Sequence, residues 1–477
     1  MKKIFTLSCI LAAALSANAQ EAFNVGPDYL QNEDGQGSVL LLLGEKLSTN
    51  KLYVSGQEQN AVVPFVWNTE TGDVKTLIEV DDVKMPINWD EDGNETEWTT
   101  EQMMRSGSFR SVSPDGVAVG SLTDQQFYIS YPVMFDATTG KHTYLYREDG
   151  DAGGEGYGIT DDSKTIVGFY FDASWITTPC LWTNNGQTRT NLPLPTAEET
   201  GFPIDYASAR WITPDGSRVL GYVQDYYSGA WVSVVWNRQE DGSYTTDCSM
   251  AQTLFQTRSY TEIEGEDGWP IFVYDEIVDP KPFTQLEPLC MSDNGEWVVC
   301  VVSDYVDEDN DQNPLMAAKN IRYNLKTGQY DAITVDGADE GAKIEIFGVA
   351  NDGTAAGRYT GPVDWETWSQ PIEGVVWPAG SANLVQLKNL FPEDAYVEGW
   401  TSSALSTISA DGKTVMGYAS DEMGGQTTFV CELPDLQEGI SSVATDAKAN
   451  IAYDLSGRRV ENAQKGFFIV NGKKVIR

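Results

Sequence analysis

The chain has 477 residues and a formal net charge of −40, because 71 acidic residues outnumber 31 basic ones. A chain this acidic repels phosphate backbones, which argues against nucleic acid as a partner and suits calcium, cationic groups or sugars. His142 is the single histidine, so histidine-rich zinc sites and Ser-His-Asp triads have almost no residues to form from.

The first 19 residues have the composition of a secretory signal peptide. Lys2 and Lys3 precede an apolar run over residues 4–15, and the small residues Ala17 and Ala19 precede the expected cleavage point. We therefore expect export, with an extracellular or outer cell-surface location. No other stretch approaches the ~18 apolar residues that span a bilayer, so no transmembrane segment is expected.

A short sequence recurs seven times between residues 47 and 417. Each copy places a turn such as Asp-Gly or Asn-Gly between short apolar runs, as in ISADGKTVMG from Ile408. The other copies begin at Leu47, Val112, Ile159, Ile212, Met291 and Val349. A partner run follows each copy and ends at Trp67, Phe135, Trp182, Trp236, Tyr323, Trp377 or Cys431. Small and β-branched residues alternating around such turns predict antiparallel hairpins, two to a unit.

A four-stranded sheet made of two such hairpins cannot bury both of its faces alone, but sheets repeated side by side can. The predicted fold class is therefore all-β: a β-propeller of seven four-stranded blades, with six or eight as alternatives, plus a small C-terminal β-hairpin tail. The propeller is expected to cover residues 20–436, with an insertion at about 247–288. The glycine near the end of most copies is expected to allow close sheet approach or a bulge.

The pattern of an ISxDGxxVVG hairpin followed by an AFxW-like strand resembles the HAF-type extracellular repeats of bacterial secreted proteins. The resemblance covers most of residues 47–433. It implies the architecture of the chain, and it implies little chemistry because the functions of that family are diverse.

The seventh unit ends at Leu433 after its third strand and lacks a fourth. The segment 22–43 precedes the first unit and contains the spare runs AFNV and SVLLLL. We expect one of these runs to pair with residues 427–432 and so to close the ring, because an open propeller exposes a long sheet edge.

The connections between strands differ on the two sides of the predicted ring. Tight Asp-Gly and Thr-Gly turns fall on one side, and long, varied loops fall on the other, where binding residues usually accumulate. Exposed aromatic rings beside carboxylates suit a glycan or a cationic ligand, and the alternative is that these rings cover loop cores. The candidate ligand-binding residues of this long-loop side are Trp175, Tyr226, Tyr227, Trp231, Trp365 and Trp368.

One acidic loop is a weak candidate for calcium. Asp307, Asp309 and Asp311 have the alternate-residue spacing of a calcium loop, but Gln312 stands where the turn glycine is usual. A solvated acidic loop is the alternative, and no other cofactor is expected.

Cys290 and Cys300 flank a predicted hairpin and are the candidate disulfide, with two buried reduced thiols as the alternative. Their placement on adjacent strands is the reason for considering the bond.

The composition changes after residue 436. Residues 437–477 hold seven basic and four acidic residues and two hairpin signals. The DLxGRxV run and the final Gly-aromatic-Ile-Val strand resemble the C-terminal sorting signals of the type IX secretion system of Bacteroidetes. The matching positions include Asp454, Gly457, Arg458 and Gly466. The resemblance implies contact with the secretion machinery and attachment at the cell surface.

No acid–base pair can be assigned from the sequence, and Ser409-Ala-Asp411-Gly412 places glycine one position too early for the Asp-box of propeller sialidases. We therefore predict a non-catalytic binding or scaffold protein that recognises a glycan or a surface protein. The alternative is a carbohydrate-active enzyme that uses loop carboxylates.

Overall fold

The protein is described by a computed structural model that covers two compact units, residues 1–432 and 433–477. It describes residues 22–434, apart from 28, 32–36, 40, 91, 93, 226–228, 257–259, 265–269, 275–280, 305–318, 336–340, 392–398 and 423. In the second unit it describes residues 452–453, 459–460, 467–470 and 473–476.

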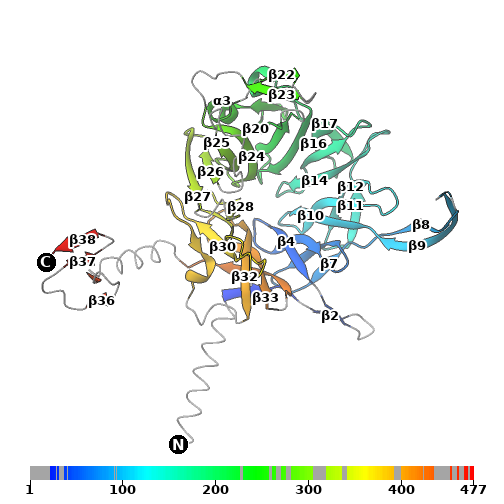
Figure 1. Ribbon diagram of the computed structural model, residues 1–477. Coiled ribbons are helices and arrows are strands. Elements are labelled where there is room, and N and C mark those ends of the chain that lie inside the picture. The colour runs from blue at the N-terminus through cyan, green and yellow to red at the C-terminus, as the bar shows by residue number, and fades with distance from the viewer. Residues whose placement is uncertain are drawn as a thin grey trace, which may run out of the picture. The chain divides into compact units, whose positions relative to one another are not determined.

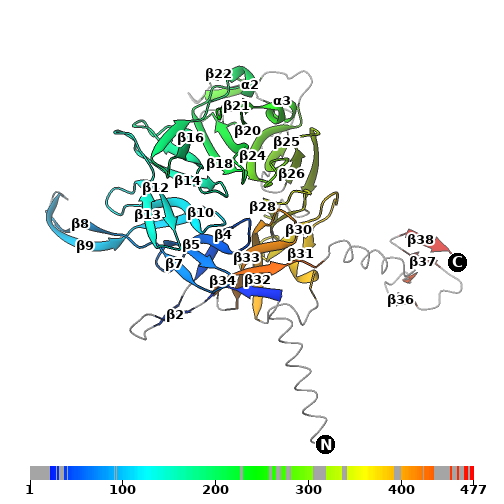
Figure 2. The same ribbon diagram turned by 180° about the vertical axis from the view of Figure 1, so that it is seen from behind.

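The first unit is an all-β propeller whose described strands form a four-stranded antiparallel sheet for each copy of the repeat, and one parallel pair, Val232 with Leu286, joins the fourth and fifth of these sheets. In Figures 1 and 2 these sheets follow one another around a ring, in chain order from blue to orange. The first three sheets are β4 (Leu42–Leu47), β5 (Tyr53–Glu58), β6 (Val63–Asn68), β7 (Val74–Thr76); β10 (Ser106–Val112), β11 (Val117–Thr123), β12 (Ser130–Asp136), β13 (Lys141–Tyr144); and β14 (Gly153–Ile159), β15 (Ile166–Phe171), β16 (Thr177–Thr183), β17 (Thr188–Asn191).

The next three sheets repeat this order. They are β18 (Tyr206–Ile212), β19 (Arg218–Gln224), β20 (Trp231–Arg238), β21 (Tyr244–Asp247); β24 (Phe283–Met291), β25 (Trp297–Asp304), β26 (Lys319–Asn324), β27 (Gln329–Thr334); and β28 (Lys343–Val349), β29 (Ala355–Thr360), β30 (Ile372–Trp377), β31 (Val385–Gln386). The short helices α2 (Ala197–Thr200), α3 (Ser249–Leu254) and η3 (Leu387–Asn389) lie in connections between sheets.

The last sheet confirms the predicted closure. Its strands β32 (Trp400–Ile408), β33 (Thr414–Asp421) and β34 (Gln426–Glu432) are completed by β1 (Phe23–Val25), which pairs antiparallel with β34. Phe23 is buried among aromatic rings, with its centroid 5.5 Å from that of Phe429. Strand β4 packs against β32, β33 and β34, so the first and last sheets are in contact.

The first strand of each sheet carries a β-bulge opposite the second strand. The register of pairing shifts after Gly44, Phe109, Gly156, Ala209, Pro288, Ile346 and Leu405. In six sheets the residue paired at this point is the repeat glycine, and a Cβ on Gly221 would lie 1.9 Å from the carbonyl oxygen of Ser208. These glycines therefore permit close approach of the backbone at a bulge, as the sequence suggested.

The aromatic residues that end the third strands form the core between neighbouring sheets. Trp67, Trp182, Trp236 and Trp377 are at most 1% exposed. The indole N–H of Trp182 donates to the carbonyl of Tyr146 at 2.9 Å, and that of Trp236 donates to Pro193 at 2.7 Å. These large rings supply much of the buried apolar area, and the indole N–H of Trp67 donates to no protein atom.

The tight turns do more than reverse the chain, because they bond to one another from sheet to sheet. Thr49 in the first turn donates to Asp161 in the third at 2.9 Å, and Lys51 pairs with Asp411 in the last at 3.0 Å. This tight-turn side is therefore a hydrogen-bonded ring of polar side chains.

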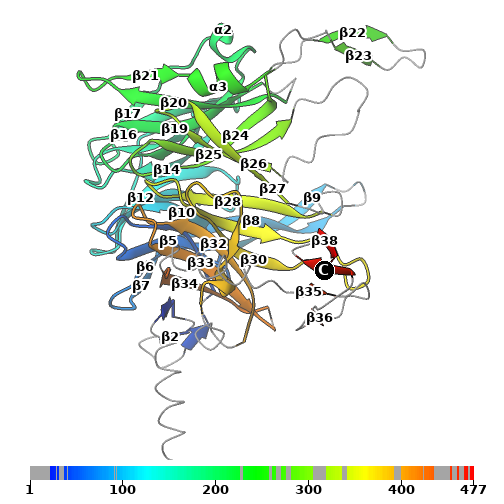
Figure 3. The ribbon, with the colours of Figure 1, turned by 90° about the vertical axis from the view of Figure 1, so that its left-hand side faces the viewer.

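Two pairs of strands lie outside the sheets on the opposite, long-loop side. The hairpin β8 (Val80–Trp89) and β9 (Glu95–Met104) joins the first two sheets, and β22 (Tyr260–Glu264) with β23 (Pro270–Tyr274) lies in the predicted insertion. Figure 3 shows β9 and the β22–β23 pair extending from the same side of the ring. The repeat resumes at Phe283, so the insertion ends earlier than predicted. A further pair, β2 (Tyr29–Gln31) and β3 (Gly37–Val39), follows β1.

The structure contradicts the candidate disulfide between Cys290 and Cys300, which are both free buried thiols. Cys290 pairs with Val299, and Cys300 pairs with Pro288 across the bulge. Because neighbouring residues of a strand point to opposite faces, the two sulfur atoms lie in different core clusters. Burial raises the pKa of the Cys300 thiol to about 12, so it stays protonated.

The second unit is a small sheet in the order β36, β35, β37, β38. Its strands are β35 (Ala452–Tyr453), β36 (Arg459–Val460), β37 (Phe467–Val470) and β38 (Lys473–Ile476). Strands β37 and β38 pair antiparallel, with Val470 opposite Lys473. The tail residues Asp454, Gly457, Arg458 and Gly466 lie outside the described residues, as does the predicted signal peptide.

Candidate functional site

The long-loop side carries the exposed aromatic residues of the propeller. Among the described residues, each aromatic side chain that is at least half exposed lies in a loop between second and third strands or in the β8–β9 hairpin. These residues are Trp89, Trp98, Phe127, Tyr128, Trp175, Trp365 and Trp368. The tight-turn side presents no such ring from its described residues, so the two sides differ in chemistry as well as in loop length.

Three of these rings stand on loop tips with an unusual backbone. Tyr128, Trp175 and Trp368 have φ values of 57°, 62° and 56°, in the left-handed region that bulky residues rarely adopt. Glycine takes a left-handed conformation in the corresponding loops of two other sheets, at Gly229 and Gly424. A left-handed conformation costs roughly 1–2 kcal/mol for a residue with a Cβ. Exposed rings held at such positions indicate a role in binding and not in the stability of the fold.

An aspartate fixes each of these tips. Asp124 accepts hydrogen bonds from the backbone N–H groups of Gln126 and Phe127 at 3.1 and 2.6 Å. Asp172 accepts from Ser174 at 2.8 Å in the Trp175 loop. Asp364 does the same for Glu366 at 2.9 Å, and hydrogen bonds from Thr367 and Glu366 hold the pKa of its carboxyl below the usual value. The tips are therefore ordered by short-range hydrogen bonds.

Trp365 and Trp368 form the most exposed aromatic pair. Their ring centroids are 5.3 Å apart and their planes are nearly perpendicular, at 87°. They are 63% and 77% exposed, so both rings offer a free face. An edge-to-face pair of this kind keeps a fixed geometry while exposing an apolar surface.

The other predicted ligand-binding residues have different outcomes. Trp175 is 54% exposed, as expected for an aromatic residue in a loop, and its ring lies beside that of Phe171. Trp231 belongs to strand β20, is half-buried, and stacks on Tyr222 at 4.7 Å, so it supports the sheet more than it faces solvent. Tyr226 and Tyr227 lie outside the described residues.

The calcium candidates Asp307, Asp309 and Asp311 also lie outside the described residues. Within the part of the chain that the structure describes, no group of three His, Cys, Asp or Glu side chains is arranged to hold a metal ion. No helix of the described residues is long and apolar enough to cross a membrane.

The β8–β9 hairpin was not predicted from the sequence. Its strands have ten residues each, and Ile87, Trp89 and Trp98 are about half exposed, at 51%, 54% and 50%. The available signal was the alternating run from Val83 to Trp89, but the acidic residues that follow it are typical of a polar loop. A two-stranded hairpin of this length is only marginally stable alone, so its base must be held.

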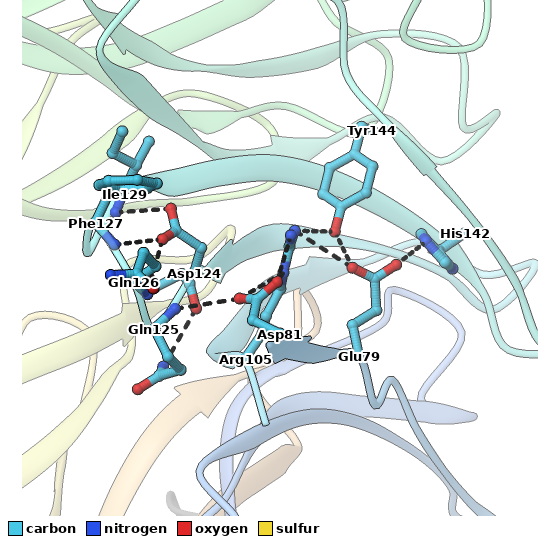
Figure 4. Close-up of polar contacts among 11 residues, drawn as sticks. Glu79, Asp81, Arg105, Asp124, Gln125, Gln126, Phe127, Ile129, His142 and Tyr144 are labelled. Atoms are coloured by element: carbon cyan, nitrogen blue, oxygen red, sulfur yellow. Dashed lines mark hydrogen bonds and ion pairs between the residues drawn. The ribbon is translucent and has the colours of Figure 1, made fainter. Parts of the chain in front are cut away.

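A polar cluster holds that base (Figure 4). Arg105 pairs with Asp81 at 2.9 Å and donates to the Tyr144 hydroxyl at 2.8 Å. Glu79 accepts from Tyr144 and lies 2.7 Å from Nε2 of His142. Burial alone would raise the pKa of Asp81, but hydrogen bonds from Arg105 and the backbone N–H of Gln125 hold it below its usual value.

The same cluster ties the hairpin to a tip. The backbone N–H of Gln125 donates to Asp81 at 3.2 Å, and that of Lys84 donates to the side chain of Gln126 at 2.9 Å. Because the same loop carries Phe127 and Tyr128, these two hydrogen bonds hold the base of the hairpin and this tip together.

A second feature lies inside the ring. A cavity of about 530 Å³ is lined by the first strands of all seven sheets. The extra residues of six bulges lie on its wall: Glu45, Arg110, Tyr157, Arg210, Phe347 and Ser406. Bulges re-aim side chains, and here they turn a ring of residues toward the centre.

Comparison with known proteins identifies no family. No family model matches the chain, and no curated protein matches it. Solved propeller structures are similar to it at low identity. The β-propeller domain of the trilobed protease from Pyrococcus furiosus is 12% identical with a TM-score of 0.38, covering 80% of this chain and 90% of that one.

Two further structures are similar at the same level. The β-propeller domain of Cps50 from Myceliophteria thermophila is 10% identical with a TM-score of 0.39, covering 82% of this chain and 98% of that one. A puromycin-hydrolysing peptidase from Mycobacterium tuberculosis is 11% identical with a TM-score of 0.43, covering 88% of this chain and 52% of the peptidase. At these scores the likeness carries no argument about function.

Proposed function

We propose that this chain is a non-catalytic binding propeller that recognises a polymeric glycan through the aromatic tips of its long-loop side. The observation that carries the proposal is the one-sided distribution of exposed rings, with Tyr128, Trp175 and Trp368 held in left-handed conformations. Aromatic faces stack on the apolar faces of sugar rings, and the neighbouring carboxylates and amides can accept or donate hydrogen bonds to hydroxyl groups.

The separation of the tips favours a polymer over a single sugar. The β11–β12, β15–β16 and β29–β30 loops belong to three different sheets, and each presents one or two rings. A repeating chain can place one unit on each tip, so that weak contacts act together at a high effective concentration. A small ligand would instead need the rings to converge on one pocket.

The proposal includes location outside the cytoplasm. It is supported by the sequence of residues 1–19, by the resemblance of the repeat to HAF-type extracellular repeats, and by the type IX sorting pattern around Gly457 and Gly466. A propeller displayed at the cell surface, with its tail engaged by the secretion machinery, would meet extracellular polysaccharide directly.

The test begins with a polysaccharide array probed with the wild-type protein and with a Trp365→Ala/Trp368→Ala variant. Stacked aromatics contribute roughly 0.5–1.5 kcal/mol each beyond area burial, so losing two should weaken binding about tenfold or more. Tyr330→Ala is the matched control, because Tyr330 is a partly exposed ring on β27, next to a tight turn.

Two results would contradict the proposal. One is equal binding by the wild-type protein and the double variant, with loss of binding in Tyr330→Ala. The other is release of reducing ends from the bound polymer, abolished by substitution of one loop carboxylate, which would establish a carbohydrate-active enzyme.

A further inference from the structure

The central cavity differs in charge from the rest of the protein. Four basic and two acidic side chains line it, whereas the whole chain has a net charge of −40. The basic residues are Lys46, Arg110, Arg210 and Arg358, and the acidic residues are Glu45 and Asp293. A cluster of arginines inside so acidic a chain requires an explanation in terms of what they contact.

Two of the arginines pair with carboxylates, although the buried Nε–H of Arg110, like that of Arg210, donates to no protein atom. Arg110 pairs with Glu45 at 2.9 Å, and Arg358 donates from Nε to Glu345 at 2.7 Å. Ser108 also donates to Glu45, at 2.6 Å, which completes that pair. These two arginines can be understood as links between neighbouring strands.

Arg210 is different. No carboxylate of the described residues lies within ion-pair distance of its guanidinium, and its one hydrogen bond is a donation to the Tyr222 hydroxyl at 3.2 Å. Its buried Nε–H donates to no protein atom. Its guanidinium carbon lies 4.9 Å from the centroid of Tyr157, and that of Arg110 lies 5.4 Å from the same ring. Two cations therefore share one aromatic ring, and one of them has no counter-charge in contact.

Glu287 on β24 is an acidic residue that interacts with Arg210. Arg210 interacts with it electrostatically but does not form an ion pair, and burial raises the pKa of the Glu287 carboxyl. The guanidinium of this cavity-lining residue thus keeps donors that no protein atom of the described residues accepts, and planar forks of this kind bind carboxylates through two parallel hydrogen bonds.

The remaining wall defines the rest of the ligand. Tyr157, Trp211, Ile212, Phe347 and Ile408 line the cavity, so most of its surface is apolar or aromatic. A volume of about 530 Å³ lies within the range of small-molecule sites, which are typically apolar with a few polar groups that fix orientation.

We propose that the central cavity binds a small carboxylic acid with an apolar or aromatic body, whose carboxylate takes its hydrogen bonds from Arg210 and whose body packs on the aromatic wall. The site is separate from the long-loop tips and does not depend on the glycan proposal.

The experiment uses the full chain and phenylacetate as the probe, measured by titration calorimetry. Phenylacetamide has the same shape without the charge, and acetate has the charged head without the body. We expect saturable binding of phenylacetate, at least tenfold weaker binding of phenylacetamide, and no saturable binding of acetate at the same concentrations.

Three variants locate the site. Arg210→Gln should weaken phenylacetate binding at least tenfold, whereas Arg238→Gln, the same charge change at an exposed position on β20, should leave it unchanged. Glu287→Gln should strengthen binding, because it removes the negative charge that acts on Arg210. This third variant keeps the proposal testable if Arg210→Gln does not fold.

The proposal is overturned if phenylacetate shows no saturable binding to the wild-type protein. Equal affinity of Arg210→Gln and the wild type, equal affinity for the acid and the amide, or weaker binding by Glu287→Gln would also overturn it. Loss of phenylacetate binding in Trp365→Ala/Trp368→Ala would place the probe at the tips and would refute the cavity site separately from the glycan proposal.

Discussion

Replacing Gly221 by alanine tests the reason why the repeat ends in glycine. The new Cβ would lie 1.9 Å from the carbonyl oxygen of Ser208 and 2.9 Å from the Cα of Ala209, whereas real Cβ contacts stay above 3.0 Å. The backbones of β18 and β19 would therefore have to separate by about 1.1 Å. The other neighbour of Gly221 is Val234 on β20, so the strand is held from both sides.

Overpacking of this kind costs about 1–3 kcal/mol, occasionally more, and backbone on both sides favours the upper end. The alanine also reduces the conformational entropy of the unfolded chain, which offsets the loss of stability by about 0.4–1 kcal/mol. We therefore expect a net loss of about 2–3 kcal/mol, seen as a lower guanidinium midpoint with an unchanged slope.

Gly156→Ala is the matched control for this prediction. Gly156 lies in a first strand with no positive φ, and its nearest neighbours to an added Cβ are ordinary contacts at 3.5 Å. The control should unfold within about 0.5 kcal/mol of the wild type, or slightly later. If Gly221→Ala and Gly156→Ala had the same midpoint, close backbone approach would not be the reason for the repeat glycine.

Three further predictions concern how the ring holds together. Phe23→Ala should cost about 3–5 kcal/mol in denaturant unfolding, because a buried ring of the closing strand is lost, and a change below about 1 kcal/mol would show that β1 closes the ring weakly. Arg322→Met should cost about 1–3 kcal/mol, because the carbonyl of Gly353 in the next sheet would lose the donor that this fully buried arginine supplies; unchanged stability would contradict this. Hydrogen bonds from Ser409 and Lys51 lower the pKa of Asp411 to about 2. The free energy of unfolding of the wild type should therefore fall by less than about 1 kcal/mol between about pH 4 and pH 2. Asp411→Asn should lack this fall when unfolding is measured across the same pH range.

The repeat predicted the sheets because its signals are local. An Asp-Gly turn such as the one at Gly116 fixes a left-handed residue between two strands, and the register of β10 and β11 follows from it. The closing strand was also predictable, since the seventh unit lacked a partner and the segment before the first unit held a spare run. Both arguments use only neighbouring residues and strand counting.

Features that depend on register were not predictable in the same way. The bulge between Pro288 and Cys290 is set by contacts between strands, so counting along the hairpin did not reveal that Cys290 and Cys300 face opposite sides. The same applies to Arg210, whose direction into the cavity follows from the bulge between Ala209 and Trp211.

The candidate site was predicted in part for a related reason. A tryptophan in a long loop, such as Trp368, is exposed because few apolar side chains surround it. Its position in a long polar stretch of the sequence is enough to predict this exposure. Trp231 begins a strand instead, and only the stacking on Tyr222 shows that it is partly covered. The β8–β9 hairpin was missed because β9 has few apolar residues and because acidic residues follow Trp89.

The central claim is that several aromatic tips bind one polymer, and the dependence of affinity on chain length tests it most directly. Oligosaccharides of increasing length, cut from the polymer that binds best on the array, would be titrated into the wild-type protein and into Tyr128→Ala/Trp175→Ala, whose two tips lie on adjacent sheets. The account predicts that wild-type affinity rises steeply once a chain can span neighbouring tips, and that the double variant loses most of this rise. A shortest fragment that binds as tightly as the polymer, with the same affinity for both proteins, would contradict it.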